Sequence, residues 1–368
     1  MIEDFRQYRQ SRHQEIIKWK LETGKRVMGV FCCNVPEEII YAADMLPVRI
    51  LGEHEETTEA DLHFPVKVCP YPKSCFDQAL KGRYDYLDGL VVPNVCDMIR
   101  AMYGFWKRSF KLPYIYFLEV PQKISTHGVD FFLKQLILFK ESLENFSGKE
   151  ITRESLLRAI EVYNENRALL SKAYEFRKGS PRLSGVETQE IVLTSMLMPK
   201  ESHNRLLSQL LDRITNRDDA PKEGVRLFVS ASMLDDTDFF QLIEECGGNI
   251  VADDMPTGSR YFFNPVDTTK EPLDALAERY LARIPCPRKM RPEARFDHVR
   301  EAMRGAEAKG VIIHNLRACD CHLYEYPYLK EKLEGEGLPV LFFRGEETET
   351  ERERQRDDIE AFIEMLRG

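Results

Sequence analysis

The segment RVMGVFCCNVPEEIIYAADMLP, residues 26–47, decides how this chain folds. Its first part is rich in Val and Phe and predicts a buried strand over residues 26–35. Pro36 suits the first turn of a helix, and apolar residues recur at helical spacing until Pro47 ends the pattern. A strand, a turn and a helix in this order are typical of an α/β domain with a parallel sheet.

Similar apolar runs, each bounded by residues that break a strand, recur in two groups along the chain. The first group continues with GLVVPNVC at 89–96 and YIYFLEVP at 114–121. The second group consists of VRLFVSAS (225–232), NIVADD (249–254), GVIIHNLRAC (310–319) and LPVLFFRG (338–345). Short apolar runs of this kind are typical of buried strands in parallel sheets.

Residues 128–215, between the two groups, show almost only helical periodicity. We therefore expect an α/β fold with two flavodoxin/Rossmann-like, doubly wound parallel-sheet domains, a helical insert and terminal helices. The expected units are an N-terminal α/β domain with a leading helix at 1–125, the helical insert at 126–222, and a C-terminal α/β domain with a terminal helix at 223–368.

Composition and charge exclude several classes of protein. The formal net charge of -9, with no long basic stripe, speaks against nucleic acid as a partner. No apolar run reaches the length of about 18 residues that spans a bilayer, and the charged N-terminus lacks the apolar centre of a secretory signal. We therefore expect a cytoplasmic protein without a membrane partner. Its nine cysteines then favour metal binding or redox chemistry over disulfides.

Five of the cysteines stand where predicted strands end. Cys32 and Cys33 close the first strand, Cys96 closes the second, and Cys319 with Cys321 closes GVIIHNLRAC. Ligands of open parallel sheets collect at the carboxyl ends of the strands. Core packing does not require cysteines at that edge, so this placement favours a functional site.

The other cysteines need separate weighing, because a free cysteine commonly packs as a small apolar residue. Cys246 and Cys286 are interpreted in that way. Cys69, Cys96 and Cys319 are each followed by Pro or Asp, which start helices, and a helix start favours the thiolate. Without a CxxC motif, spacing alone leaves both a zinc site and an iron-sulfur cluster open. Three cysteines from separate segments with an open fourth position fit a bridged or substrate-binding cluster better.

Motifs for nucleotides are absent from the sequence. There is no GxGxxG and no GxxxxGK[ST], so any ATP that is used has to be handled by a partner. The segment ADDMPTGSRYF (252–262) is more suggestive, because Gly258, Ser259 and Arg260 follow a strand and could form an anion-binding turn. A simple loop between a strand and a helix is the alternative. Arg260 is our candidate for substrate binding.

Several segments resemble the family of 2-hydroxyacyl-CoA dehydratases and benzoyl-CoA reductases. They are CPYPKSCFDQALKGRYDYLDGLVVPNVCDMIRAMYGFW (69–106), VPEEIIYAADMLPVRILG (35–52), VRLFVSASMLDDTDFFQLIEECGGNIVADDMPTGSRYF (225–262) and RACDCHLYEYPYLKEKLEGEGLPVLFF (317–343). The resemblance covers nearly the whole chain in the right order.

This resemblance implies a [4Fe-4S] cluster, or a fused double cubane, as cofactor. The implied ligands are Cys69, Cys96 and Cys319. Cys75 lies six residues from Cys69 and Cys321 two residues from Cys319, so either is an alternative ligand, as is Cys33 of the doubled pair. Cys321 also departs from the family pattern, in which we expect a proline at that position.

The resemblance also implies an enzyme that injects single electrons at low potential into a CoA thioester, under anaerobic conditions. Its implied partners are a homologous cluster-binding subunit or a second copy of this chain, and an activator protein that hydrolyses ATP and carries its own iron-sulfur cluster. CDMIRAMYGFW with YFLEVPQKIS resembles the smaller benzoyl-CoA reductase subunit, which favours an aryl-CoA reductase.

Three alternatives stay open at this point. One is an (R)-2-hydroxyacyl-CoA dehydratase subunit that acts through a ketyl radical. Another is a homodimeric double-cubane reductase of small molecules. The third belongs to a different class: a non-catalytic two-domain binding module whose cysteines are structural.

Overall fold

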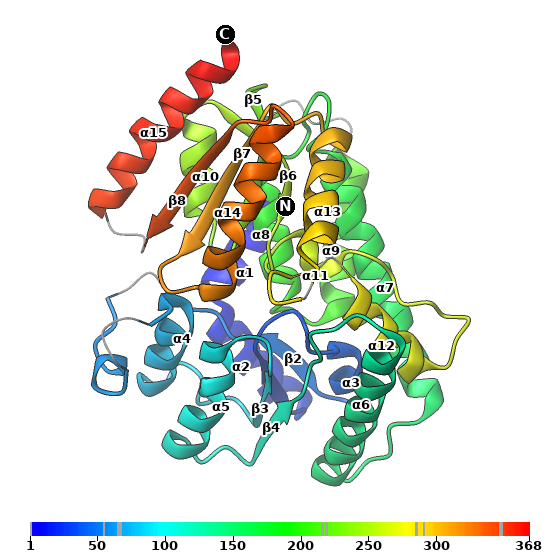
Figure 1. Cartoon of the computed structure of the whole chain (residues 1–368). Coiled ribbons are helices and arrows are strands. Elements are labelled where there is room, and N and C mark those ends of the chain that lie inside the picture. Colours follow the sequence, from blue (N-terminus) through cyan, green and yellow to red (C-terminus); the bar gives the residue numbers. More distant parts are fainter. Residues whose placement is uncertain are drawn as a thin grey trace.

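The computed structural model describes residues 2–53, 56–64, 68–214, 217, 220–283, 286–289, 291–345 and 349–368. Two halves lie one above the other in Figure 1, each around a four-stranded parallel sheet. The strand orders are β2-β1-β3-β4 and β6-β5-β7-β8. In both sheets the chain begins at an inner strand and builds outward to both edges, which is the doubly wound order. The predicted fold class is confirmed.

The first half contains the leading helices and the first sheet. Its strands are β1 (Val27–Val30), β2 (Leu46–Arg49), β3 (Gly89–Pro93) and β4 (Tyr114–Leu118). Its helices are α1 (Ile2–Gln10), α2 (Arg12–Thr23), α3 (Glu37–Ala42), the 3-10 turn η1 (Ala60–Leu62), α4 (Pro70–Leu80) and α5 (Asp97–Ser109). The helices α6 (Thr126–Ser147), α7 (Arg153–Glu175), α8 (Gly185–Ser195) and α9 (Lys200–Ile214) follow.

The second half repeats the alternation of strands and helices. Its strands are β5 (Val225–Ala231), β6 (Gly248–Asp254), β7 (Gly310–Leu316) and β8 (Val340–Gly345). Its helices are α10 (Asp238–Glu245), α11 (Ser259–Phe262), α12 (Pro272–Ala282), α13 (Pro292–Gly305), α14 (Asp320–Gly335) and α15 (Glu349–Arg367). Within the described residues no helix is both long and apolar enough to cross a membrane. The bounds expected for the three units stay a prediction. The helix α12, in the expected C-terminal domain, packs against α6 of the expected insert, so contacts cross the expected boundary.

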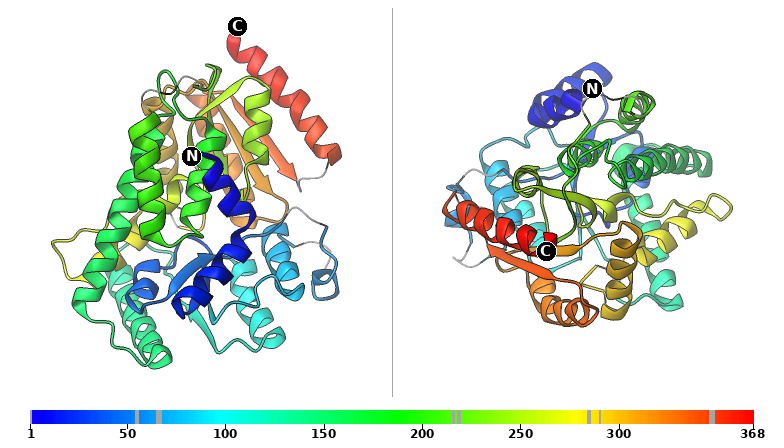
Figure 2. Two further views of the ribbon diagram at one scale, coloured as in Figure 1. Left: turned by 180° about the vertical axis from the view of Figure 1, so that it is seen from behind. Right: turned by 90° about the horizontal axis from the view of Figure 1, so that it is seen from above.

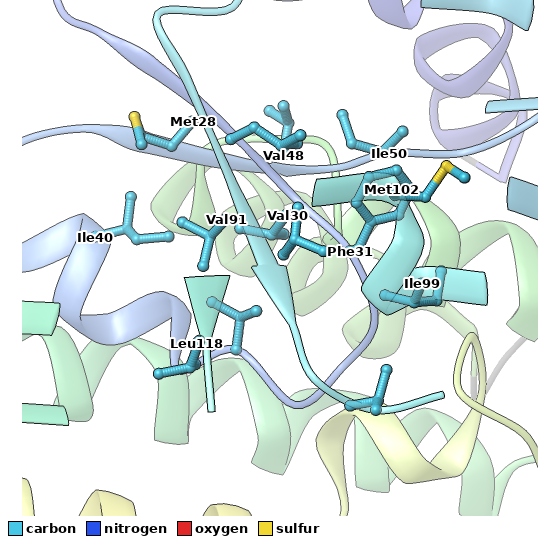
Figure 3. Packing of buried hydrophobic residues seen from close by; sticks show 14 of the residues in the cluster. Met28, Val30, Phe31, Ile40, Val48, Ile50, Val91, Ile99, Met102 and Leu118 are labelled. Atoms are coloured by element: carbon cyan, nitrogen blue, oxygen red, sulfur yellow. The ribbon is translucent and has the colours of Figure 1, made fainter. Parts of the chain in front are cut away.

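The first sheet has a closely packed core (Figure 3). Val30 of β1 lies opposite Val91 of β3, and both side chains are fully buried. Gly29 is closely surrounded, because a Cβ atom there would lie 2.8 Å from the Cδ1 of Ile50, so a larger residue would require its neighbours to shift. Packing of this density holds the strands in fixed positions relative to one another.

Two predicted elements differ from the structure. The helix expected to reach Pro47 ends at Ala42, and Asp44 has a left-handed φ of 62°. The chain then forms β2, where Pro47 is tolerated because β2 is an edge strand. The leading helix is divided at Ser11 into α1 and α2, which run along the back of the molecule past both halves (Figure 2), with α1 packed on α8.

A buried polar layer connects α3 of the first half with helices from the rest of the chain. Glu38 accepts a hydrogen bond from the hydroxyl of Tyr280 at 2.7 Å and forms an ion pair with Arg167. Glu37 accepts a hydrogen bond from the hydroxyl of Tyr261 at 2.8 Å. Burial alone would raise the pKa of Glu38, but the charges of Arg167 and a neighbouring arginine outweigh it and lower that pKa. A charge at this depth is stable only while its partner remains.

We predict that Glu38→Gln lowers the free energy of unfolding by about 3–5 kcal/mol at pH 7, because Arg167 then carries a buried charge without its partner. The pKa of Glu38 is lower in the folded chain than the value of about 4.3 usual for an unfolded one. Its stabilisation is therefore complete above that value and is lost as the pH falls through the folded pKa. Denaturant titrations at pH 7 and at about pH 3, well below the unfolded value, test this: the gap between wild type and variant should narrow in acid, and a constant gap would contradict the assignment.

Candidate metal centre

The site lies where the connections of both sheets diverge. In the first sheet, the connection after β1 leads to β2 at one edge, whereas the connection after β3 leads to β4 at the other. Cys33 follows β1 and Cys96 follows β3. In the second sheet, Ser232 follows β5 and Cys319 follows β7 in the same arrangement. These positions are the switch points at which open α/β sheets bind ligands, and here the two switch points face each other.

A cavity of about 310 Å³ occupies the space between the two switch points. In Figure 1 the strands β7 and β8 point down towards the first half, and the start of α14 lies above α4 and α5. Four cysteines line it, namely Cys69, Cys96, Cys319 and Cys321. The cavity thus brings together the three predicted ligands and one of their alternatives.

A larger cavity of about 760 Å³ lies elsewhere. Its lining includes Tyr41, Arg158 and Glu201, and it borders Lys25 and Leu46 at the amino ends of the first two strands. It is therefore at the opposite end of the first sheet from the cysteines. We place the candidate site in the smaller cavity, because its thiols supply chemistry that size alone does not indicate.

The three predicted ligands share one local structure: each is the N-cap residue of a helix. Cys69 precedes α4, Cys96 precedes α5 and Cys319 precedes α14. The positive ends of three helix dipoles therefore point at the cavity and favour negative charge on sulfur. Ala318, directly before Cys319, has a left-handed φ of 57°, and backbone strain of this kind concentrates at functional sites.

The thiols at the cavity differ in how readily they lose a proton. A hydrogen bond from the Cys69 thiol lowers the pKa of Cys319 although burial opposes the shift, and the backbone N–H of His322 and the Ser232 hydroxyl act in the same direction. Burial raises the pKa of Cys96 to about 11. Binding of a metal would therefore displace protons from most of these sulfurs, so it should weaken as the pH falls.

The remaining predicted alternatives lie outside this cavity. Cys75 is fully buried within α4, where its neighbours include Tyr71 and Asp235. Cys32 and Cys33 instead line a second cavity of about 20 Å³, with space for one water-sized group. There the sulfur of Cys33 accepts a hydrogen bond from Nη2 of Arg283 at 3.1 Å.

The place of Cys286 beside the doubled cysteines is a feature that the sequence did not reveal, because IPCPRK resembles an ordinary surface loop. The structure places Cys286 in the lining of the second cavity, beside Cys32 and Cys33. Lys289, three residues further on, lines the same cavity and donates a hydrogen bond to the carbonyl oxygen of Pro121 at 2.6 Å. Cys286 lies about 250 residues from Cys32 and Cys33 in the sequence, so no local pattern could have connected them.

Arg260 is buried and engaged within its own half. Its guanidinium pairs with Asp254, and Nη2 lies 3.0 Å from Oδ2 of that carboxylate. The backbone N–H of Ser259, which we expected to face an anion, donates to Oδ1 of Asp253 at 2.8 Å. Arg260 also lines the second cavity, and its role in substrate binding stays a prediction.

The donor set suits a metal-sulfur group better than a single hard ion. Thiolates are soft ligands that select iron-sulfur clusters, zinc or Cu(I). Among the described residues, no three His, Cys, Asp or Glu side chains converge on one point as they would around a single ion. A cluster of several iron and sulfide atoms extends over a wider space, and three N-cap thiols around a cavity of this size are compatible with it.

Comparisons with known proteins agree with the motifs in the sequence. Residues 32–366 match the family model described as 2-hydroxyglutaryl-CoA dehydratase, D-component. The chain is 30% identical over 369 residues to the (R)-phenyllactyl-CoA dehydratase beta subunit of Clostridium sporogenes, covering 99% of this chain and 98% of that protein. It is 28% identical over 360 residues to a benzoyl-CoA reductase subunit of Thauera aromatica, covering 95% of this chain and 93% of that protein.

A third relative, the (R)-2-hydroxyglutaryl-CoA dehydratase beta subunit of Acidaminococcus fermentans, is 26% identical over 377 residues, with 100% of this chain and 99% of that protein covered. All three similarities extend over nearly the full length of both chains, and the family model includes Cys69, Cys96 and Cys319 in its span. The chain belongs to the enzyme family of the 2-hydroxyglutaryl-CoA dehydratase D-component.

Proposed function

We propose that this chain is the iron-sulfur subunit of a cytoplasmic enzyme that passes single electrons to a CoA thioester. Its cluster is a [4Fe-4S] group held by Cys69, Cys96 and Cys319. The observation that carries the proposal is the meeting of three helix N-caps, all cysteines, at the facing switch points of two sheets. The names of the relatives, which are dehydratase and reductase subunits for CoA thioesters, support the substrate class.

The bound cluster would supply an electron at low potential. The chain's own residues would set that potential through burial of the sulfurs, through the N–H groups of the first helical turns and through nearby charge. Cys69 is buried and Cys96 and Cys319 are partly buried, so water has limited access to the sulfurs. Three protein ligands leave one position to a group that the chain does not provide.

The relatives are named as subunits, which supports a partner chain. We propose a homologous cluster-binding subunit or a second copy of this chain. The electron would come from an ATP-hydrolysing iron-sulfur activator, since the sequence carries no phosphate-binding motif of its own.

The cluster and its ligands can be tested on anaerobically purified protein by iron and acid-labile sulfide analysis with EPR. We expect Cys69→Ser, Cys96→Ser and Cys319→Ser each to lose most of the iron and sulfide. The matched control is Cys246→Ser, because Cys246 ends α10 at the opposite end of the second sheet and should keep full content.

Other variants decide between the alternatives for ligands. Cys75→Ser, Cys33→Ser and Cys321→Ser should each keep the cluster. If one of these variants loses the cluster, while the variant of the proposed ligand that it could replace keeps the cluster, the first residue is the ligand and the second is not. Iron at twice the expected content would favour the fused double cubane, and zinc without sulfide would leave only the non-catalytic binding module.

The reaction itself is a second prediction. We favour ATP-coupled reduction of an aryl-CoA thioester such as benzoyl-CoA, with dehydration of an (R)-2-hydroxyacyl-CoA as the alternative. Identities of 30% to a dehydratase subunit and 28% to a reductase subunit do not separate the two. With activator and partner present, a reductase should consume ATP in proportion to product. A dehydratase should form many products for each electron supplied, and that result would contradict the reductase.

A further inference from the structure

The first turns of α14 carry two cysteines and are separated from the rest of the helix by a proline. Cys319 is the N-cap residue, Cys321 follows it, and Pro327 lies inside the helix. Proline has no N–H to donate, and its ring presses against the carbonyl four residues earlier. The turns that hold the two thiols therefore receive less support from their own helix than an uninterrupted helix would give. They need an anchor from elsewhere in the fold.

That anchor is a buried ion-pair network directly before the proline. Nε of Arg295, in α13, donates to Oε2 of Glu325 in α14 at 2.5 Å. The same guanidinium pairs with Asp254 at the end of β6, and its Nη2 donates to the hydroxyl oxygen of Ser230 in β5 at 3.1 Å. The side chains of Arg295 and Asp254 are almost completely buried, and that of Glu325 is 9% exposed. One arginine thus fixes the start of α14 to two strands of the second sheet.

A network of this kind tolerates little rearrangement. Arg295 pairs with both carboxylates, and separating a buried charge from a partner is costly, so the fold favours the arrangement in which both contacts are made. Its planar guanidinium fixes direction as well as distance. Glu325 is therefore held in one rotational position about the axis of α14, and the residues before it in the same turns are held with it.

That rotation decides which thiol faces the other ligands. Cys319 is the N-cap residue, outside the regular helix, whereas Cys321 lies in the first turn, and both border the cavity. In the observed rotation the thiol of Cys319 interacts with the thiol of Cys69 and the hydroxyl of Ser232. Because both sulfurs border the same cavity, a displacement of the first turn would change which of them lies nearer to Cys69.

We propose that Arg295 and Glu325 are positioning residues that select Cys319 rather than Cys321 as the cluster ligand. The inference rests on the proposed function, since it assumes that a cluster is bound between the two sheets. It assigns to the Arg295–Glu325 pair a role beyond stability: the pair determines which of two neighbouring sulfurs binds iron.

The same two helices offer a matched control beyond the proline. Arg304 of α13 donates to Oε2 of Glu336 at 3.1 Å, where Glu336 directly follows the end of α14. This pair also joins α13 to the α14 segment, but it lies after Pro327 and is partly exposed, with the Arg304 side chain 68% exposed. Removing it should leave the rotation of the first turns unchanged.

The test compares Glu325→Gln, Arg295→Met and Arg304→Met in the full chain, purified anaerobically, with circular dichroism to confirm folding and EPR to record the cluster. Glu325→Gln keeps the pair of Arg295 with Asp254 and is the variant to rely on if Arg295→Met does not fold. We expect Glu325→Gln and Arg295→Met each to split the wild-type EPR signal into two species. Arg304→Met should keep a single signal.

The decisive step adds Cys321→Ser. In the Glu325→Gln background it should remove the second species, whereas in the wild-type background it should change nothing. A folded Glu325→Gln protein that keeps the wild-type signal, binds no cluster, or retains the second species after Cys321→Ser would overturn the proposal. Absence of a cluster from the wild-type chain would instead overturn the proposed function.

Discussion

The thiols of Cys69 and Cys319 meet because the carboxyl ends of two separate parallel sheets face each other across a gap. Most other features of the molecule keep these two thiols close together. Parallel strands place their loops at one edge, and close packing around Gly29 holds the strands in position. The cavity exists only as long as the two halves keep their spacing, so the site belongs to neither half alone.

The polar interior of the chain follows from the same constraint. An apolar contact between two halves permits sliding, since hydrophobic burial has no direction. Glu37 and Glu38 instead bind the hydroxyls of Tyr261 and Tyr280, and Arg167 neutralises Glu38. Hydrogen bonds and ion pairs have preferred geometries, and buried ones tolerate little misalignment. The acidic residues that follow Pro36 therefore specify the relative position of the two halves.

The sequence was sufficient for every described strand except β2, and it singled out as first-choice ligands three of the four cysteines that line the cavity. Strand ends are local features, so Cys96 and Cys319 could be placed from the apolar runs that precede them. The short edge strand β2 was missed, because the apolar residues before Pro47 also match helical spacing. Cys286 and Arg283 were missed for a different reason: their partners, Cys32 and Cys33, lie in a distant segment, and only the folded chain brings them together.

The N-cap positions of the three cysteines also bear on how this family can diverge. A residue that caps a helix is fixed by the first turn, and the rest of the helix extends away from the site. Substitutions along the outer turns of α4, α5 and α14 can then accumulate, and helices can slide or lengthen at their far ends, without moving a sulfur. A chain built in this way can change along most of the length of these helices and still present the same three thiols to its cavity.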